Sequence, residues 1–312
     1  MNKEDDIRLD QKVRAAWMYY IAGLNQSEIA SQLGTSRPVV QRLIAAAKDE
    51  GIVSIGLHHP VANCLDYAQL LKEKYQLTDC NIMPVYSIES TLDSVTFGCY
   101  QLMARYLQGD KPTIVGIGSG LTLKKTIKRI DFDSQNTRCV ALISAMNEHG
   151  QCNYYDDVPL LLARKIQGKY YQWPAPRYAQ SREEYQMWST NRLFRNVSTV
   201  ARDSDVIFVG IGALGRQSPI FKDGFIDEQQ LEELTARGGV GEILGRFIDA
   251  EGNVVESQIN QMITSHDIRE SNCPRIAAAC GEDKRPAILA ALKGGWINGM
   301  VTDEHTARWL LT

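Results

Sequence analysis

The clearest chemistry in this sequence lies in a glycine-rich stretch, GIGSGLTL, at residues 116–123. An apolar run precedes the stretch and a predicted helix follows it. Turns of this kind bind anions, because the exposed N–H groups at a helix start and the helix dipole both favour negative charge. Hydroxyl side chains in the turn offer additional hydrogen bonds. We therefore predict a ligand site formed by Gly116, Gly118, Ser119, Gly120 and Thr122.

The glycine spacing argues against a dinucleotide as the ligand. A dinucleotide fingerprint reads G-x-G-x-x-G, with an acidic residue about 20 positions later at the end of the next strand. Here the third glycine comes one position early and Leu121 stands in its place. The candidate acids, Asp131 and Asp133, precede the next predicted strand instead of ending it. Neither glycine-rich loop of the chain matches the phosphate-binding pattern G-x-x-x-x-G-K-[ST].

A second glycine-rich stretch, GIGALGRQ at residues 210–217, resembles the G-x-G-x-D-G-H stretch of glucosamine-phosphate deaminases. Leu214 and Gly215 follow Ala213 where that family has Asp-Gly-His, so the catalytic histidine is missing. The glycines that would hold the sugar phosphate, including Gly212, are retained. This combination predicts a sugar-binding pocket with no catalytic residue, no cofactor and no metal ion.

Three other stretches are predicted to be loops at the same edge of the fold: SAMNEHG (144–150), GRFIDAEG (245–252) and GEDKR (281–285). Asn147 makes the first loop more polar. The carboxylate of Asp249 suits sugar hydroxyls, although an aspartate in such a place is about as often a turn former. Lys284 suits a phosphate, although a lone lysine is more often a solvated surface charge.

The segment 10–55 predicts three short helices with a glycine-containing turn between the second and the third. Two short helices joined in this way form the helix-turn-helix layout, whose second helix enters the DNA major groove. The apolar spacing i, i+3, i+4, i+7 indicates which side chains are buried. They are Val13, Ala16, Trp17 and Tyr20 in the first helix, Ile29, Ala30 and Leu33 in the second, and Val39, Val40, Leu43 and Ile44 in the third.

The charge of this segment favours DNA, since residues 11–48 contain five basic side chains and one acidic side chain. Arginine suits the exposed edge of guanine, and glutamine that of adenine. The alternative is a three-helix packing module with a solvated polar face. We predict DNA contacts from Gln26, Ser36, Arg37, Gln41 and Arg42. Because such modules bind as dimers on two half-sites, the rest of the chain must supply oligomerisation.

Beyond residue 56, predicted strands alternate with predicted helices. The strands lie at 80–85, 113–118, 139–144, 206–212, 276–279 and 299–301, and the main helices at 66–76, 92–107, 121–130, 158–166 and 286–295. Apolar strands alternating with helices indicate a parallel sheet covered on both faces. We therefore predict an N-terminal all-α helix-turn-helix domain at 1–55 and a C-terminal α/β parallel-sheet effector domain at 56–312.

The composition is that of an ordinary globular protein, with 312 residues, 44% hydrophobic side chains and a net charge of −3. The first ten residues lack the apolar core of a signal peptide, and no apolar run approaches the roughly 18 residues that span a bilayer. Seven cysteines without a C-x-x-C pair argue against a disulfide framework and a zinc site. We expect a cytoplasmic protein with buried free thiols.

Nearly the whole chain resembles the SorC family of sugar-responsive bacterial transcriptional regulators. The motifs that carry the resemblance are QSEIASQLGTSRPVVQRL, GIGSGLTL, VGIGALG, GEILGRFIDAEG and KGGWINGMVTDEHTARWLL. The resemblance implies a Rossmann-like effector domain related to sugar-phosphate isomerases and deaminases, a tetrameric assembly, and DNA affinity tuned by a sugar, polyol or phosphorylated derivative. It places Gly116, Gly118, Ser119, Gly120, Asp249 and Lys284 around the effector. The loop SAMNEHG departs from the family, which usually has more glycine there, so the identity of the effector stays open.

Together these observations predict a non-enzymatic transcriptional regulator that forms a homo-oligomer, a dimer or a tetramer. It binds double-stranded operator DNA under the control of a sugar, polyol or sugar-phosphate effector. The alternative is a sugar-phosphate isomerase or deaminase with an appended helical module.

Overall fold

The computed structural model describes residues 3–53, 59–144, 146 and 158–312. The chain divides into two compact units, Met1–His59 and Pro60–Thr312. The boundary between them lies four residues after the predicted one, at 59 instead of 55.

The first unit consists of helices α1 (Lys3–Tyr20), α2 (Gln26–Gln32) and α3 (Arg37–Asp49). Ile29 and Ala30 of α2 pack with Val40 and Ile44 of α3, as the spacing predicts. Gly34 adopts a φ of +62° between the two helices, a conformation that glycine takes without steric cost.

The buried face of α1 was predicted wrongly in part. Val13 is 44% exposed and Trp17 is 57% exposed, whereas Ala15 and Ala16 are buried. Small alanine side chains let α1 lie close against α3. Met18 and Tyr20 also pack against this core, whereas Leu9, Val13 and Trp17 form an exposed ridge on the solvent side of the helix.

The second unit is built around a seven-stranded sheet in the order β1-β10-β9-β5-β2-β3-β4, with every pairing parallel. The parallel sheet predicted from the alternating elements is confirmed. Its strands are β1 (Asp79–Met83), β2 (Thr113–Ile117), β3 (Thr137–Ala141), β4 (Lys169–Tyr171), β5 (Val206–Val209), β9 (Arg275–Ala278) and β10 (Gly299–Asp303).

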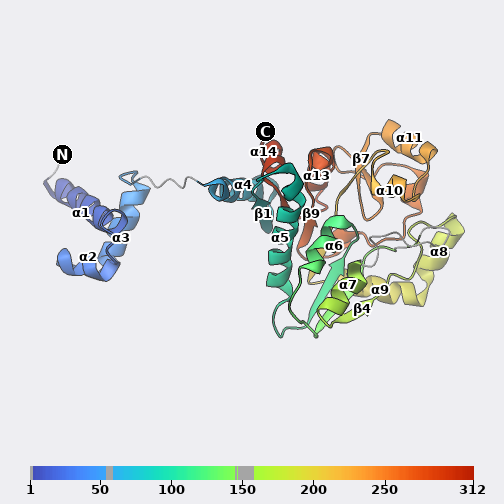
Figure 1. The fold of residues 1–312 in the computed structure, drawn as a ribbon, viewed down its shortest axis with the longest axis horizontal. Helices are drawn as coiled ribbons and strands as arrows, with labels where there is room; N and C mark the ends of the chain where they lie inside the picture. Colours follow the sequence, from blue (N-terminus) through green and yellow to red (C-terminus); the bar gives the residue numbers. More distant parts are fainter. Residues whose placement is uncertain (1–2, 54–58, 145, 147–157) are drawn as a thin grey trace. The chain divides into compact units, whose positions relative to one another are not determined.

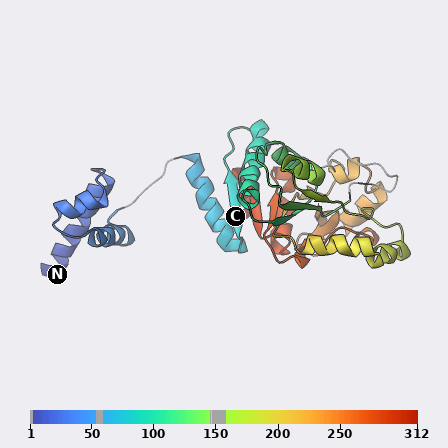
Figure 2. The same ribbon diagram turned by 90° about the horizontal axis from the view of Figure 1, so that it is seen from below.

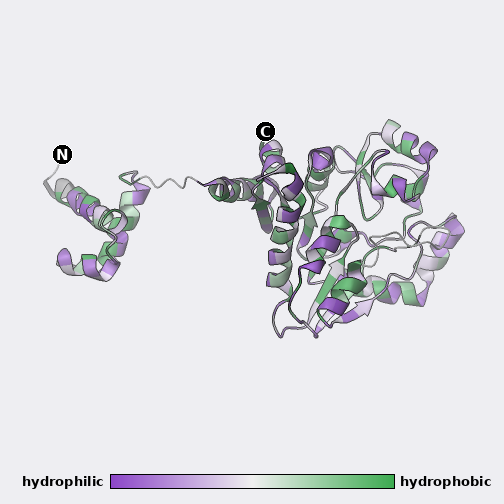
Figure 3. Ribbon diagram, viewed as in Figure 1, coloured by the Kyte–Doolittle hydropathy of each residue, from purple (hydrophilic) through white to green (hydrophobic). Residues whose placement is uncertain are grey.

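Helices cover both faces of this sheet. Because successive side chains of a strand point to opposite faces, each strand contributes to two hydrophobic cores. Ile114 belongs to one core and the adjacent Val115 to the other. In Figure 2 the strands lie between the green helices α6 and α7 and the yellow helix α9, and Figure 3 shows the apolar strands in the interior. One face packs against α5 (Ile88–Leu107), α6 (Leu121–Lys128) and α7 (Val158–Lys165), and the other against α4 (Pro60–Tyr75), α9 (Arg192–Arg202), α13 (Arg285–Lys293) and α14 (Glu304–Leu311).

A smaller antiparallel sheet extends this unit, next to the region labelled α10 and α11 in Figure 1. It contains β6 (Gly212–Ala213), β7 (Gly239–Ile243) and β8 (Arg246–Asp249). The remaining helices are α8 (Arg182–Thr190), α10 (Pro219–Lys222), α11 (Glu228–Ala236) and α12 (Gln258–Gln261), with short 3₁₀ turns at Ile268–Glu270 and Glu282–Lys284.

Two sequence predictions fail at this smaller sheet. The strand predicted at 206–212 is two strands of different sheets, because the chain leaves the parallel sheet after Val209. The loop predicted at 245–252 contains strand β8. The stretch 245–252 begins and ends with glycine, and glycines are typical of loops, so its sequence does not indicate a strand. Among the described residues, no helix is long and apolar enough to cross a membrane.

Candidate functional site

The first unit carries a helix-turn-helix with well-defined helix starts. The side chain of Asn25 accepts hydrogen bonds from the N–H groups of Ser27 and Glu28, and the Glu28 carboxylate accepts the Asn25 N–H in return. This reciprocal cap fixes where α2 begins. Ser36 is the N-cap position of α3, and Pro38 occupies its first turn, where a missing N–H costs nothing.

The predicted DNA-contacting side chains lie together on the exterior of α2 and α3. Ser36, Arg37, Gln41 and Arg42 are exposed, and Gln26 is half-buried. The Arg37 Nε donates to the Gln26 side chain at 3.4 Å, which joins the starts of the two helices. The opposite face of α3 is buried through Val40, Ile44 and Ala47. A polar face therefore stands away from the small core of the unit.

In the second unit, a pocket opens where the topology of the parallel sheet changes direction. Strands β2 and β5 are neighbours, but the chain runs from β2 through α6 to β3 on one side and from β5 towards β9 on the other. Loops that leave adjacent strands in opposite directions open a crevice beyond the carboxyl ends of the strands, where open α/β sheets bind ligands. We call this cavity, of about 420 Å³, the switch-point pocket.

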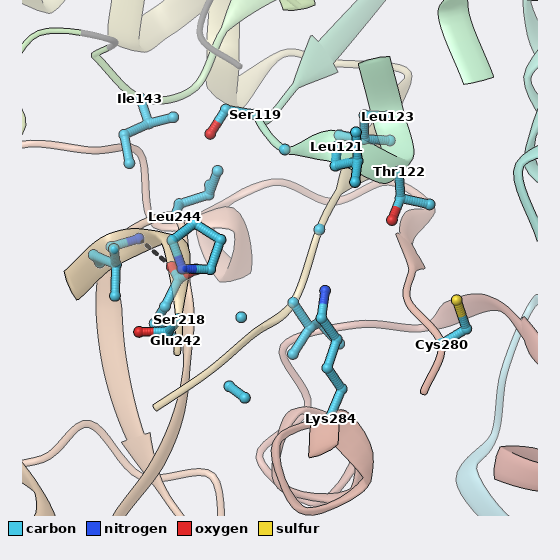
Figure 4. A pocket seen from close by; sticks show the side chains of 18 of the residues that line it. Ser119, Leu121, Thr122, Leu123, Ile143, Ser218, Glu242, Leu244, Cys280 and Lys284 are labelled. Carbon is cyan, nitrogen blue, oxygen red and sulfur yellow. Dashed lines mark hydrogen bonds between the residues drawn. The ribbon is translucent and has the colours of Figure 1, made fainter. Parts of the chain in front are cut away.

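Five of the nine predicted effector residues line the switch-point pocket: Ser119, Gly120, Thr122, Gly212 and Lys284. Figure 4 shows the Lys284 side chain extending from the start of α13 towards the middle of the cavity, with Ser119 and Thr122 on the opposite wall. The turn after β2 and the 3₁₀ turn before α13 therefore meet across one space.

Gly116 and Gly118 do not line the pocket, and the structure gives them a packing role. A Cβ atom on Gly116 would lie 2.8 Å from Ile207 Cγ1 and 3.0 Å from the Ser204 hydroxyl oxygen. A Cβ atom on Gly118 would lie 3.0 Å from Leu244 Cδ2. These glycines let neighbouring elements approach closely enough to form the pocket.

Gly120 supports the predicted anion site directly. It is the N-cap residue of α6 with φ +120° and ψ 161°, a region that is essentially restricted to glycine. No side chain of the described residues caps this helix. Gly120 and the first three residues of α6 line the cavity, so the N–H groups of this helix start and the positive end of its dipole lie at the pocket wall.

Lys284 and Glu242 place opposite charges at this pocket. Burial lowers the pKa of Lys284, against the opposing effects of Cys280 and Glu242. Burial raises the pKa of Glu242, against the opposing effects of the Gly245 N–H, Arg177 and Lys284. The Glu242 carboxylate accepts the Gly245 N–H at 2.7 Å. Both side chains have therefore lost part of their hydration. A bound ligand with an anionic group near Lys284 and hydrogen-bond donors near Glu242 would compensate for this loss.

Arg177 adds a second cation to the lining. It is buried, its guanidinium lies 3.5 Å from the centroid of the Phe225 ring, and it donates two hydrogen bonds to the Ser144 carbonyl oxygen. These contacts hold the guanidinium in a fixed position beside the cavity.

Asp249, predicted to lie around the effector, does not line the switch-point pocket. Its carboxylate accepts the N–H groups of Glu251 at 3.0 Å and Asn253 at 2.8 Å, together with the Asn253 amide. Asp249 therefore stabilises a turn, which is the second of the two roles that its sequence context allows. Asn147, also predicted at the pocket, lies outside the described residues.

Glu242, Arg177 and Ser218 line the pocket but were not predicted. Glu242 sits on β7, which pairs with β8 through a two-residue turn at Leu244 and Gly245, both with positive φ. Such turns favour Asn-Gly. With leucine in the first position, the sequence carried no strong hairpin signal, so the carboxylate on the preceding strand was overlooked.

Among the residues described, no cluster of three or more His, Cys, Asp or Glu side chains is arranged to hold a metal ion. The polar groups of the switch-point pocket suit a small polar ligand instead.

The chain has extensive similarity to known proteins. Residues 59–312 match the family model described as "Putative sugar-binding domain". The erythritol catabolism regulatory protein EryD of Brucella abortus is 30% identical over 302 residues, which cover 96% of this chain and 95% of that protein. The transcriptional regulator LsrR of Escherichia coli K12 is 31% identical over 313 residues, covering 97% and 94% respectively.

The fold is also found among solved structures. The full-length sorbitol operon regulator SorC from Klebsiella pneumoniae matches with a TM-score of 0.72 and 26% identity, over 99% of this chain and 100% of that chain. Both the helical unit and the α/β unit are therefore included in the similarity.

Proposed function

The chain belongs to the SorC family of sugar-responsive transcriptional regulators, and from this membership we propose which parts of it bind DNA and effector. As a member it is a DNA-binding regulator controlled by a sugar. The operator is contacted by α2 and α3 of the first unit. The effector is bound in the switch-point pocket of the second unit.

The DNA contacts are made by Ser36, Arg37, Gln41 and Arg42, with Gln26 at the start of α2. Replacing Arg42 by alanine weakens operator binding by about 1–3 kcal/mol if the guanidinium reads a base edge. Lys48→Ala is the matched control, because Lys48 is also exposed and basic but lies in the last turn of α3. Fluorescence anisotropy at a fixed salt concentration measures the affinity of both variants for operator DNA. If the two variants lost the same amount of affinity for the operator, Arg42 would not be a residue that reads a base.

The effector is a sugar or polyol that carries a phosphate. A single observation supports the phosphate: the side-chain-uncapped start of α6 and the half-buried Lys284 face one cavity. Glu242 supplies a carboxylate for hydroxyl groups. A cavity of about 420 Å³ is within the range for small-molecule sites. Isothermal titration calorimetry with a series of polyols and their monophosphates tests this assignment, and tighter binding of unphosphorylated members would contradict it.

Effector binding acts through a shift between two arrangements of a dimer or tetramer in the cytoplasm. A ligand changes such an equilibrium only through different affinities for the two arrangements. Coupling of about 1–3 kcal/mol alters operator affinity some 5- to 150-fold. Light scattering of the chain with and without effector gives the oligomeric state, and operator titrations under both conditions give the coupling.

The protein has no enzymatic activity in this proposal. One observation favours the competing function: burial raises the pKa of Glu242, as in many general acids, and Glu242 lines a pocket with Lys284. Against it, Ala213-Leu214-Gly215 replace the Asp-Gly-His of the deaminases. Sugar phosphates that raise the melting temperature are incubated with the protein and followed by NMR. Isomerisation or deamination would establish the enzymatic alternative.

A further inference from the structure

An apolar ridge on α1 has no role in the core of the first unit. Leu9, Val13, Trp17 and Ile21 follow one another at intervals of four residues, from α1 into the residue after it. They are 43%, 44%, 57% and 72% exposed. The face of α1 that packs on the other helices is instead formed by Ala15, with Met18 and Tyr20 partly buried beside it. We call these four residues the α1 ridge.

A contiguous ridge differs from the scattered apolar side chains of an ordinary surface. Single exposed leucines need no explanation, but a continuous apolar surface marks a site of association. A tryptophan near its centre is the residue type most enriched in the energetic centres of protein interfaces. Ridges made of residues four apart interdigitate with ridges of the same spacing in another helix. A second copy of this chain carries a ridge of the same spacing, so the α1 ridge can pack against itself.

We propose that the α1 ridge packs antiparallel against the α1 ridge of a second copy of this chain, across a two-fold axis near Val13. Leu9 of each copy then packs on Trp17 of the other. The charges of α1 favour this direction, because residues 3–10 contain four acidic and two basic side chains while residues 11–20 contain two basic and no acidic ones. Lys12 is paired with Glu50 within its own unit, so antiparallel packing brings the acidic half of each helix towards Arg14 of the other.

Asp10 and Arg14 make the match more specific. They form an ion pair at 2.6 Å within one helix and lie on the same flank of the α1 ridge. In an antiparallel pair centred on Val13, Asp10 of one copy lies beside Arg14 of its partner. Each ion can then interact with both copies, as expected of a self-complementary two-fold interface.

This inference rests on the proposed function, since two helix-turn-helix units must reach two half-sites at a fixed separation. One helix pair buries less than the roughly 1,200 Å² of a stable interface. When the second units are already assembled, however, the tethered helices meet at an effective concentration in the millimolar range. A weak contact then suffices to align the two copies of α3.

The first test measures binding to a duplex that the full-length chain selects from a random-sequence library, and to the same duplex with one half-site scrambled. Trp17→Glu is expected to lower affinity for the intact duplex about tenfold or more, and affinity for the scrambled duplex less than twofold. Gln11→Glu adds the same charge at another exposed position of α1 and leaves both affinities unchanged. Equal losses on both duplexes for Trp17→Glu would overturn the inference, because the ridge would then serve the unit itself or a different partner.

The second test needs no DNA. Val13→Cys in the full-length chain is expected to form a disulfide-linked dimer on mild oxidation, because residue 13 meets its own copy. Gln11→Cys and the wild-type chain give the background, including that of the native thiols. Cross-linking of Val13→Cys no greater than this background would overturn the inference. A wild-type chain that selects no duplex would instead overturn the proposed function, while the Val13 result would still decide the packing of α1.

Discussion

Two walls of the switch-point pocket offer different kinds of chemistry to a ligand. On one wall, the turn after β2 presents backbone N–H groups through Gly120, with the hydroxyls of Ser119 and Thr122 beside them. On the other wall, the β7–β8 hairpin presents the carboxylate of Glu242 beside its turn at Leu244 and Gly245. The first wall suits anionic groups and the second suits hydroxyl donors, so a phosphorylated polyol has one end for each.

The two walls also differ in whether consecutive residues are enough to form them. A backbone anion site requires only glycine and a helix start in consecutive residues, which a single stretch of sequence contains. A side-chain site depends on which residue of a strand reaches the pocket, and therefore on strand register. Asp249 pairs with Gly239 at the far end of the hairpin, whereas Glu242 pairs with Phe247 near the turn. At about 3.3 Å per residue, three residues along β8 carry Asp249 roughly 10 Å from the turn.

Lys284 is expected to give the largest change in effector affinity, because it supplies a side-chain charge opposite the backbone wall. Lys284→Gln keeps a polar side chain and removes the cation. A hydrogen bond to a charged group contributes about 1.5–3 kcal/mol, so the affinity for a phosphorylated polyol should fall roughly 10- to 150-fold. Calorimetry should show a much smaller loss for the unphosphorylated polyol.

Lys293→Gln is the matched control for Lys284, since Lys293 is exposed at the other end of the same helix. Its affinity for effector should equal that of the wild-type chain. If Lys284→Gln weakened both ligands equally, the lysine would contact the sugar and the phosphate would lie elsewhere.

Glu242→Gln probes the hairpin wall and should lower effector affinity about 5- to 30-fold, or roughly 1–2 kcal/mol. The amide retains an oxygen for the Gly245 N–H, so the hairpin should persist. Because burial raises the pKa of Glu242, wild-type affinity should also decline as the pH falls towards that pKa, whereas the variant lacks this component. Comparing the two proteins across pH cancels the titration of the effector phosphate.

Glu256→Gln, at an exposed position, controls for the change of charge in the Glu242 experiment. Affinity unaffected by Glu242→Gln would leave the hairpin wall without a role in recognition, and the pocket would then distinguish its ligands through the backbone wall alone.

The sequence predicts the parallel sheet, the helix-turn-helix and the glycine turn of the backbone wall, because each depends on short-range periodicity or on closely spaced glycines. Properties that depend on packing between distant segments do not follow from the sequence. The spacing of Val13 and Trp17 predicts an apolar face, but not whether that face meets a core. Likewise, both Asp249 and Glu242 follow glycine-rich stretches, and only the β7–β8 register separates the turn former from the pocket carboxylate.

Gly120→Ala tests the backbone wall with a smaller expected effect. A Cβ atom there meets nothing within 4 Å, so the cost arises from the backbone at φ +120° and not from a clash. Such strain amounts to about 1–3 kcal/mol, and partial relaxation of the turn would move the N–H groups and lower effector affinity several-fold. Gly109→Ala, with φ +132° and equally open surroundings, should lose similar stability without losing affinity. Parallel losses of affinity in the two variants would indicate a general effect of destabilisation.

Asp249→Ala should leave effector affinity unchanged, which makes it the sharpest contrast with Glu242. The substitution removes a carboxylate that accepts the N–H groups of Glu251 and Asn253, so the unfolding free energy should fall by about 1–2 kcal/mol. Urea denaturation measures this loss, and calorimetry at a temperature well below the transition measures the affinity. If Asp249→Ala abolished effector binding while the protein stayed folded, the effector would bind at the other end of the hairpin. The division of the pocket into a backbone wall and a Glu242 wall would then be wrong.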